Sequence, residues 1–175
     1  YFSKNTLNLP RTTFPMKAYL PKRELPISKF WDEIGLYRLV QEKNAGRPKF
    51  ILHDGPPYAN GDIHLGQALN KILKDMVLRY WRMKGFSVVD TPGFDMHGLP
   101  IEVKVEKELG VKRKQDIETK IGMDKFVVRC KEYALSNLDQ MTAQFVRLGV
   151  WMNWKRPYRT LDNPYIEGTW YLVKR

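Results

Sequence analysis

His64 and Gln67 are the residues of this 175-residue chain whose types and spacing most directly suggest chemistry. They stand at the start of a helical pattern, and residues three apart share one helical turn. A helix N-terminus presents unpaired N–H groups and a partial positive charge, which favour a bound phosphate. An imidazole and an amide can follow that phosphate through a change of geometry, so the pair predicts transition-state stabilisation at phosphorus. The alternative is an ordinary capping or half-buried histidine.

A strand, a turn and a helix must position these two residues. Residues 50–52 form a short apolar run typical of a buried parallel strand, and the Gly-Pro-Pro at 55–57 predicts a turn. Residues 60–62 occupy the positions where helix N-caps are found, and Gly85 stands where the helix would end. Gly66 predicts a bare backbone that a nucleotide can approach closely, or simple packing. The helix itself is predicted from apolar residues at helical spacing: Leu65, Leu69, Ile72, Leu73, Met76, Val77, Tyr80 and Trp81.

A second short strand is predicted at 86–90, directly after this helix. Two strands joined by such a helix form a parallel, right-handed βαβ crossover, whose ligands bind beyond the carboxyl ends of the strands. Residues 54–67 and 92–102 both follow strand ends, so we expect them to meet in one cleft. Asp95 lies in the second segment, in a predicted turn after Gly93 and Phe94. Its carboxylate could pair with an ammonium group, or it could cap the following helix.

The flanking segments are predicted to support this unit. Residues 1–26 contain four prolines, which predict an extended arm, and residues 27–44 show the pattern of one amphipathic helix. The charge-rich stretch 102–120 predicts a solvated helical face interrupted at Gly110. A long apolar stripe predicts one helix over about 123–148. A last helix is expected to begin at Asn163-Pro164.

Aromatic and basic residues alternate near the C-terminal end. Such an arrangement can stack bases and hold phosphates, although packing of the rings against the sheet is the alternative. The residues are Trp151, Trp154, Lys155, Arg156, Tyr158, Arg159 and Tyr165.

Composition places the chain among globular proteins that attract polyanions. Apolar residues make up 43%, charged residues 28%, and the net charge is +11 with a pI of about 9.7. This excess predicts RNA or nucleotide phosphates as partners, or a merely solvated basic face. The single Cys130 excludes an internal disulfide and is typical of a reducing compartment, here the cytoplasm. One cysteine and three dispersed histidines form no zinc pattern, and no signal peptide or membrane span is expected.

Three sequence blocks carry a resemblance to the class I aminoacyl-tRNA synthetases. Residues 54–67, Asp-Gly-Pro-Pro-Tyr-Ala-Asn-Gly-Asp-Ile-His-Leu-Gly-Gln, resemble the "HIGH" signature region, and the wording of 53–61 is characteristic of the isoleucyl enzymes. Residues 92–102, Pro-Gly-Phe-Asp-Met-His-Gly-Leu-Pro-Ile-Glu, resemble a second motif of the same enzymes. Residues 147–154 and 158–166 resemble the segment that leads into their connective insertion. The blocks stand in the family's order and span nearly the whole chain.

Two positions depart from the family pattern. The last histidine of the signature is Gln67 here, which keeps a hydrogen-bond donor but cannot carry a positive charge. The aromatic residue before Asp95 is Phe94 where tryptophan is more usual, which keeps the aromatic face and removes one N–H donor.

The resemblance implies an α/β fold: the first half of a Rossmann-like (HUP-type) parallel sheet with flanking helices. This catalytic half would span 49–154, after an N-terminal arm and helix over 1–48 and before the start of the connective insertion at 155–175. The implied activity is ATP-dependent activation of isoleucine to isoleucyl-adenylate and transfer to tRNA(Ile). The implied partners are isoleucine, ATP with Mg²⁺, tRNA(Ile) and the remainder of a longer synthetase chain. No protein-bound metal, membrane or oligomer is expected.

The resemblance also assigns site residues by motif position. His64 and Gln67 would be catalytic. The ATP-binding set would be Asn60, Gly61, His64, Gly66 and Gln67, and the amino-acid-binding set Gly55, Pro56 and Asp95. Tyr58, His97 and Glu102 match motif positions without a fixed role.

Two alternatives remain open. The family's Lys-Met-Ser-Lys-Ser loop, editing insertion and anticodon-binding domain are not found among these 175 residues. A non-catalytic, basic scaffold that binds RNA or nucleotides is therefore the first alternative. A valyl or leucyl relative is the second, and the Pro-Pro-Tyr-Ala-Asn-Gly and His-Gly-Leu-Pro-Ile-Glu wording argues against it.

Overall fold

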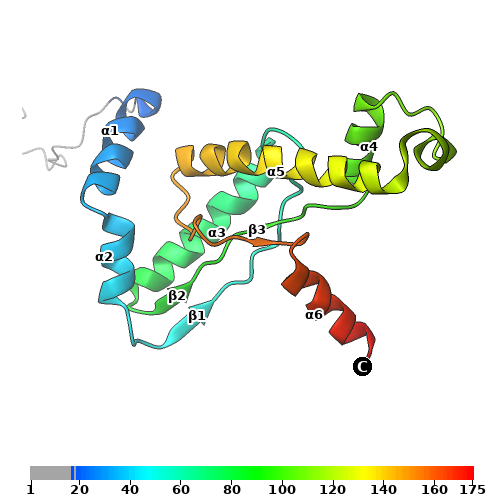
Figure 1. Ribbon diagram of the computed structural model, residues 1–175. Coiled ribbons are helices and arrows are strands. Elements are labelled where there is room, and N and C mark those ends of the chain that lie inside the picture. The colour runs from blue at the N-terminus through cyan, green and yellow to red at the C-terminus, as the bar shows by residue number, and fades with distance from the viewer. Residues whose placement is uncertain (1–16, 18) are drawn as a thin grey trace, which may run out of the picture. The chain divides into compact units, whose positions relative to one another are not determined.

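The computed structural model describes residue 17 and residues 19–175, which form mixed α/β structure (Figure 1). Contacts divide the chain into two compact units, Tyr1–Arg38 and Leu39–Arg175. None of the helices in the described part has the length and apolar character needed to cross a bilayer. The elements are α1 (Leu20–Glu33), α2 (Leu36–Lys43), β1 (Lys49–Ile51), α3 (Leu65–Met83), β2 (Ser87–Val89), β3 (Gly93–Phe94), α4 (Leu99–Glu108), the π-helical turn η2 (Ile117–Ile121), α5 (Met123–Arg147), β4 (Tyr158–Arg159) and α6 (Asn163–Val173).

The first two helices correct the boundaries that were predicted near the N-terminus. Helix α1 begins at Leu20, with Pro21 in its first turn, where a missing N–H breaks no helical hydrogen bond, and it also contains Pro26. The extended arm is therefore wrong from Leu20 onward; its residues 1–16 and 18 lie outside the described part. The single helix predicted for 27–44 is wrong too, because Gly35, with φ of +61°, separates α1 from α2.

The predicted βαβ unit is confirmed. Strands β1 and β2 pair in parallel, with Lys49 opposite Ser87 and Ile51 opposite Val89, and α3 connects them. Figure 1 shows α3 running alongside this strand pair. The loop that leaves β1 and the first turn of α3 consequently lie next to each other at one end of the unit.

Gly93 and Phe94 form strand β3, which pairs in parallel with β4, and Asp95 forms a bridge with Tyr58 where a turn was predicted. Gly93 lies opposite Tyr158, and Phe94 lies opposite Arg159. A Cβ atom at position 93 would lie 2.1 Å from Cζ of Tyr158, so the pairing requires glycine there. This pair ties the segment after α5 to the second motif block.

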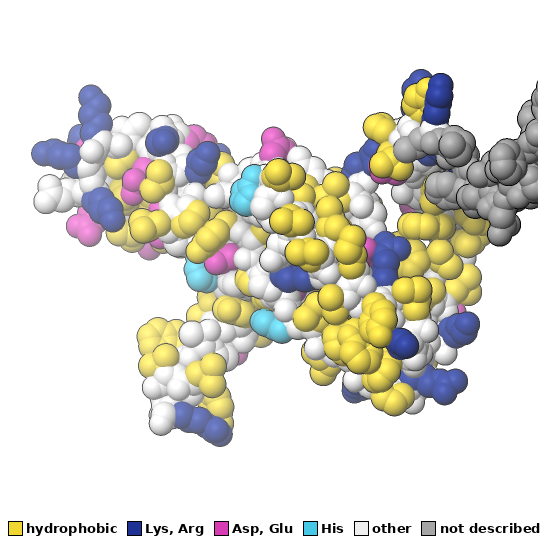
Figure 2. All heavy atoms as spheres, turned by 180° about the vertical axis from the view of Figure 1, so that it is seen from behind, with side chains coloured by type: hydrophobic (Ala, Val, Ile, Leu, Met, Phe, Trp, Pro, Cys, Tyr) yellow, Lys and Arg dark blue, Asp and Glu magenta, His cyan; other side chains and the backbone are white. Residues whose placement is uncertain are grey.

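Helix α3 was predicted correctly as a helix, but its start and its faces differ from the expected ones. Its N-cap is His64, so the N-cap predicted at residues 60–62 is wrong. The residues it buries are mostly charged: Lys71, Asp75, Leu78 and Arg82. The outer side carries apolar residues that are between 41% and 86% exposed: Leu65, Leu69, Leu73, Met76, Val77, Tyr80 and Met83. Figure 2 shows hydrophobic side chains gathered over the middle of the face seen from behind.

Two apolar clusters stabilise the second unit. The larger joins α4, η2 and α5 to the two motif blocks: Ala59, Phe94, Met96, Ile101, Val105, Ile117, Phe126, Ala134, Met141 and Phe145. The smaller packs β2 and the segment after α5 onto α3: Leu78, Val88, Val150 and Met152. The predicted long helix is confirmed as α5, the predicted break at Gly110 follows α4, and α6 begins at Asn163 as expected.

Candidate functional site

His64 is the residue that starts α3, and Gln67 completes its cap. Nδ1 of His64 accepts the Gln67 backbone N–H at 3.2 Å, and Oε1 of Gln67 accepts the His64 backbone N–H at 3.0 Å. This reciprocal pair is a capping box, which satisfies two backbone donors at once. His64 therefore caps α3, as the alternative predicted, and the capping contact uses only one of its two ring nitrogens.

The cap determines which atoms remain for a ligand. Because Nδ1 of His64 accepts a hydrogen bond, the neutral imidazole carries its proton on Nε2. Because Oε1 of Gln67 is also engaged, its amide NH₂ remains available to donate. Capping therefore leaves two outward donors next to the N–H groups of the first helical turn, a combination that suits an anion.

A pocket of about 260 Å³ adjoins these donors. One wall comes from the loop after β1 and the other from the first two turns of α3: Gly55, Pro56, Pro57, His64, Gly66, Gln67, Asn70 and Lys71. Five of the predicted site residues therefore line one pocket. Its volume is below the range of sites that enclose a whole drug-sized ligand, and it fits a phosphate group with its immediate neighbours.

Gly66 has no side chain and therefore leaves the space that the His64 imidazole occupies. A Cβ atom there would lie 3.1 Å from Cε1 and 3.2 Å from Nδ1 of His64, closer than ordinary packing allows. We expect Gly66→Ala to displace the ring and to weaken binding of inorganic pyrophosphate about tenfold, the loss of one typical charge-assisted hydrogen bond. Titration calorimetry measures this. Gly168→Ala, at a helical glycine with nothing within 4 Å, is the matched control; equal affinities in both variants would contradict the expectation.

Asp95 meets the signature loop, as predicted from topology. The Ala59 N–H donates to the Asp95 carbonyl at 2.9 Å, and the Asp95 N–H donates to the Pro57 carbonyl at 2.8 Å. Tyr58 forms a parallel bridge with Asp95. The carboxylate accepts from Oγ1 of Thr160 at 3.3 Å, whereas α4 has no side-chain cap. The alternative in which Asp95 caps α4 is therefore wrong.

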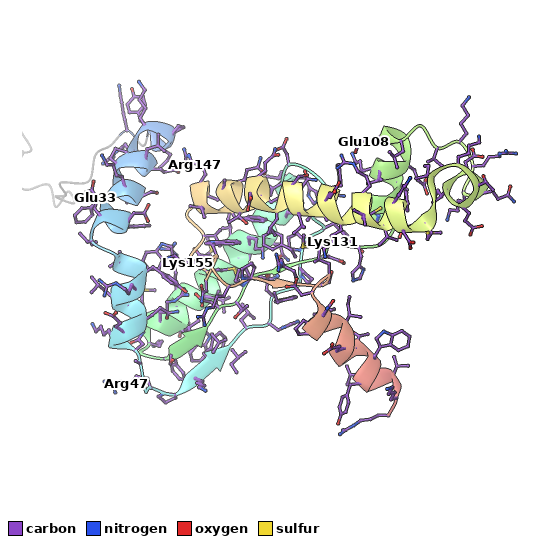
Figure 3. All side chains as sticks on the ribbon, in the orientation of Figure 1. Glu33, Arg47, Glu108, Lys131, Arg147 and Lys155 are labelled. Carbon is purple, nitrogen blue, oxygen red and sulfur yellow. The ribbon has the colours of Figure 1, made fainter. Side chains whose placement is uncertain are left out.

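The other predicted site residues lie away from the pocket. The carbonyl of Asn60 accepts from the Tyr133 hydroxyl of α5 at 3.2 Å, and neither Asn60 nor Gly61 lines the pocket. His97 and Glu102 line a separate cavity of about 670 Å³ between α4, η2 and α5, which Lys131, labelled in Figure 3, also lines. The structure thus does not bring His97 and Glu102 to the capping pair.

Buried charges around Asp54 were missed by the sequence reasoning. The Asp54 side chain is fully buried; Oδ2 accepts from Nζ of Lys71 and, at 2.8 Å, from the Gly93 N–H. Oδ1 accepts from Nζ of Lys74 at 2.7 Å. Burial lowers the pKa of Lys71, and the Asp54 carboxylate opposes that shift. The signal in the sequence was the helical spacing of Gln67, Lys71 and Lys74 on one side of α3.

Tyr158 was predicted only as part of the aromatic cluster. Its hydroxyl donates to the Asp54 carbonyl, and its ring stacks on His53 with centroids 5.6 Å apart. Burial, with the nearby Asp54 carboxylate, raises the pKa of Tyr158 to about 12, so the phenol stays protonated as a donor. Trp154 stacks on Phe145 at 5.6 Å. These contacts match the alternative in which the rings pack against the protein, and they explain the positions of Tyr158 and Trp154 without a stacked base.

No metal-binding group is assembled within the described residues. Groups of three or more histidine, cysteine or acidic side chains placed to hold an ion are absent from this part of the chain. Burial raises the pKa of the Cys130 thiol, which keeps it in its less reactive form.

Comparison with known proteins agrees with this architecture. The family model described as tRNA synthetases class I (I, L, M and V) matches residues 26–175. Isoleucine–tRNA ligases are 53% identical over 160 residues in Pyrococcus abyssi and 56% over 158 residues in Archaeoglobus fulgidus. These alignments cover 91% and 90% of this chain but 15% of each relative. The chain thus spans about 15% of the length of the curated relatives it matches.

A solved structure shares the fold. It is the crystal structure of the ternary complex of Agrobacterium radiobacter K84 agnB2 LeuRS-tRNA-LeuAMS, with a TM-score of 0.62 and 21% identity over 87% of this chain and 17% of that one. The likeness covers the short parallel strands and the helices around them. The family match confirms the resemblance read from the motifs, and it establishes that this chain belongs to the class I tRNA synthetases and is related to the isoleucine–tRNA ligases.

Proposed function

We propose that this chain forms the amino-acid-activating part of an isoleucine–tRNA ligase. A carboxylate oxygen of isoleucine attacks the α-phosphorus of ATP, the bond to the β-phosphate oxygen breaks, and pyrophosphate leaves with the electron pair. The acyl group of the isoleucyl-adenylate then passes to the 3′-terminal adenosine of tRNA(Ile), and AMP leaves. The observation that carries the proposal is the capping box of α3, whose residues His64 and Gln67 both line the pocket, in a chain similar to isoleucine–tRNA ligases.

The donors of His64 and Gln67 would act at the α-phosphate. Charge grows on the phosphate oxygens in the transition state, and fixed donors at a helix N-terminus stabilise that charge without reorganising. Gly66 leaves room for the approach, and Asn60 and Gly61 would support the nucleotide farther along the loop. Asp54, the buried carboxylate that directly precedes Gly55, is engaged by two lysines, so it is not available to a metal ion. Magnesium would therefore arrive on the ATP and balance its charge there.

The amino acid would bind beside the phosphate, against the loop wall of the same pocket. Pro56 and Gly55 offer an apolar wall for a branched side chain, and the Asp95 carboxylate, 23% exposed, would pair with the ammonium group. We propose the N-terminal half of a Rossmann-like catalytic domain over 49–154, the start of the connective insertion over 155–175, and a supporting N-terminal segment over 1–48. We also propose a cytoplasmic location, which the single cysteine supports because it is typical of a reducing compartment.

Asp95→Asn is expected to weaken isoleucine binding about 10- to 100-fold, because an ammonium group loses its charged partner. The KM for ATP should stay unchanged, since Asp95 lies outside the phosphate pocket. Both KM values come from pyrophosphate exchange with the complete polypeptide that carries these residues. Asp162→Asn, at a carboxylate paired with Arg159, is the control. Equal losses for isoleucine and ATP would argue against an amino-group role.

The function itself is tested by amino-acid-dependent exchange of labelled pyrophosphate into ATP. The complete polypeptide should exchange with isoleucine faster than with valine or leucine at equal concentrations. A preference for valine or leucine would identify the corresponding relative instead. A folded protein that binds ATP and tRNA but exchanges with none of the three would be a nucleic-acid-binding scaffold.

A further inference from the structure

A buried group of one carboxylate and two ammonium groups lies directly behind the phosphate pocket. We call Asp54, Lys71 and Lys74 the Asp54 cluster. The side chains of Asp54 and Lys71 are 0% and 1% exposed, and that of Lys74 is 16% exposed. Nζ of Lys71 also lies 5.4 Å from the centroid of the Phe145 ring and 5.8 Å from that of Trp154. The Lys71 ammonium is therefore held between a carboxylate and two aromatic faces.

The Asp54 cluster connects the two walls of the pocket. Asp54 directly precedes Gly55, the first residue of the loop wall. Lys71 follows Gln67 by one helical turn on the same side of α3, and it lines the pocket as well. Lys74, one turn farther, donates to both Asp54 and the Gly55 carbonyl, the latter at 3.3 Å. Lys71 and Lys74 of α3 thus both contact the segment that begins the loop wall.

The same carboxylate fixes the wall against the second motif block. Oδ2 of Asp54 accepts the Gly93 N–H at 2.8 Å, and the Asp54 carbonyl accepts the Tyr158 hydroxyl. Buried ion pairs add little to stability compared with apolar packing, because desolvation offsets their attraction. What they do provide is a defined geometry, and here that geometry is the separation between the loop and the helix start.

We propose that Lys71 is a positioning residue for amino-acid activation: through Asp54 it holds the loop wall, Gly55 and Pro56, at the distance from His64 and Gln67 that attack on phosphorus requires. This inference rests on the proposed function and adds to it a residue whose ammonium group is buried against Asp54 and acts through that carboxylate. Reacting atoms must lie about 3–3.5 Å apart and in line, so a small shift of one wall slows the step while each substrate still binds.

Lys71→Met tests the proposal, because it keeps the volume and removes the charge. In the complete polypeptide, kcat of isoleucine-dependent pyrophosphate exchange should fall about 100-fold, the cost of a misplacement of about 1 Å. The KM values for isoleucine and ATP should stay within about threefold. Arg82→Met is the matched control, since Arg82 is a buried cation of the same helix and pairs with Asp90 at the other end. It should lower the melting temperature but keep kcat within about threefold.

A double variant separates positioning from charge balance. Lys71→Met alone leaves the Asp54 carboxylate without its buried partner and should lower the melting temperature. Asp54→Asn combined with Lys71→Met removes both charges of the pair and should restore the melting temperature. We expect kcat to remain low in the double variant. Recovery of both the melting temperature and kcat would overturn the proposal, as would a rate loss in Lys71→Met no larger than that in Arg82→Met.

Amide hydrogen exchange provides a readout that does not depend on activity. The protected N–H groups of Ala59, Gly93 and Asp95 report on the loop and its neighbours. Lys71→Met should speed their exchange, whereas Arg82→Met should not; unchanged exchange in Lys71→Met would overturn the positioning role. Wild-type protein that activates no amino acid would refute the proposed function, and amide exchange would then still decide whether Lys71 holds the loop.

Discussion

Replacing His64 by asparagine is expected to slow isoleucine activation by about 100- to 1000-fold, the usual effect of removing one donor from a developing anion. Asparagine is among the best N-cap residues, so the start of α3 should survive the change. The imidazole Nε2–H is lost, however, and the shorter amide does not reach the same point. Single-turnover formation of adenylate by the complete polypeptide measures the rate, and thermal unfolding measures the helix.

His64→Ala completes this experiment. Alanine removes the donor and the cap together, so the protein should lose activity and about 1 kcal/mol of stability. If His64→Asn keeps the wild-type rate while His64→Ala loses stability, the histidine serves the helix and not the reaction. The pair of variants thereby separates the two roles that the capping box combines in one side chain.

The largest expected loss of stability follows from Gly93→Ala. The new Cβ atom would lie 2.1 Å from Cζ and 2.4 Å from both Cε1 and the hydroxyl oxygen of Tyr158. Neither partner can move easily, because Gly93 pairs with Tyr158 in the β3–β4 sheet and the Tyr158 hydroxyl donates a hydrogen bond to the Asp54 carbonyl. We expect the free energy of unfolding to fall by about 3 kcal/mol, the upper part of the range for overpacked sites. Denaturant unfolding measures it.

A double-mutant cycle shows whether the ring causes this loss. Tyr158→Ala removes the obstacle, so Gly93→Ala in that background should cost about 1 kcal/mol or less. Purely additive effects would mean that the Tyr158 ring is not what excludes a side chain at Gly93.

Local sequence patterns were enough to predict most of the helices and strands around the site. The strands of the βαβ unit, the course of α3 and the long helix α5 all follow from apolar spacing and from glycines beyond the helix ends. The meeting of segments 54–67 and 92–102, seen in the bridge between Tyr58 and Asp95, followed from topology, because parallel strands present their carboxyl ends on the same side. Gly55, Pro56, His64, Gly66 and Gln67, which the motif positions assign to the site, line one pocket.

The remaining features depend on contacts between distant segments. Strands β3 and β4 have two residues each, too short for a periodic signal, and they pair across α4 and α5. The N-cap was expected at Asn60–Asp62 because Asn and Asp are stronger caps than His, but Asp62 is engaged by Gln144 of α5 at 2.6 Å. The burial of Lys71 was not predicted, and it follows from the carboxylate and rings that contact it.

The exposed apolar side of α3 affects the solubility of the protein. Seven large apolar side chains are exposed to water along the outer side of this helix, whose inner side is mostly charged. Leu65 and Met83 are the most exposed of the seven. Strips of this kind promote association and poor solubility. Production of these 175 residues alone would therefore call for a solubilising fusion or for apolar-to-polar changes on that outer side, for example at Leu69 and Leu73. Such changes would leave the buried lysines and the capping histidine untouched.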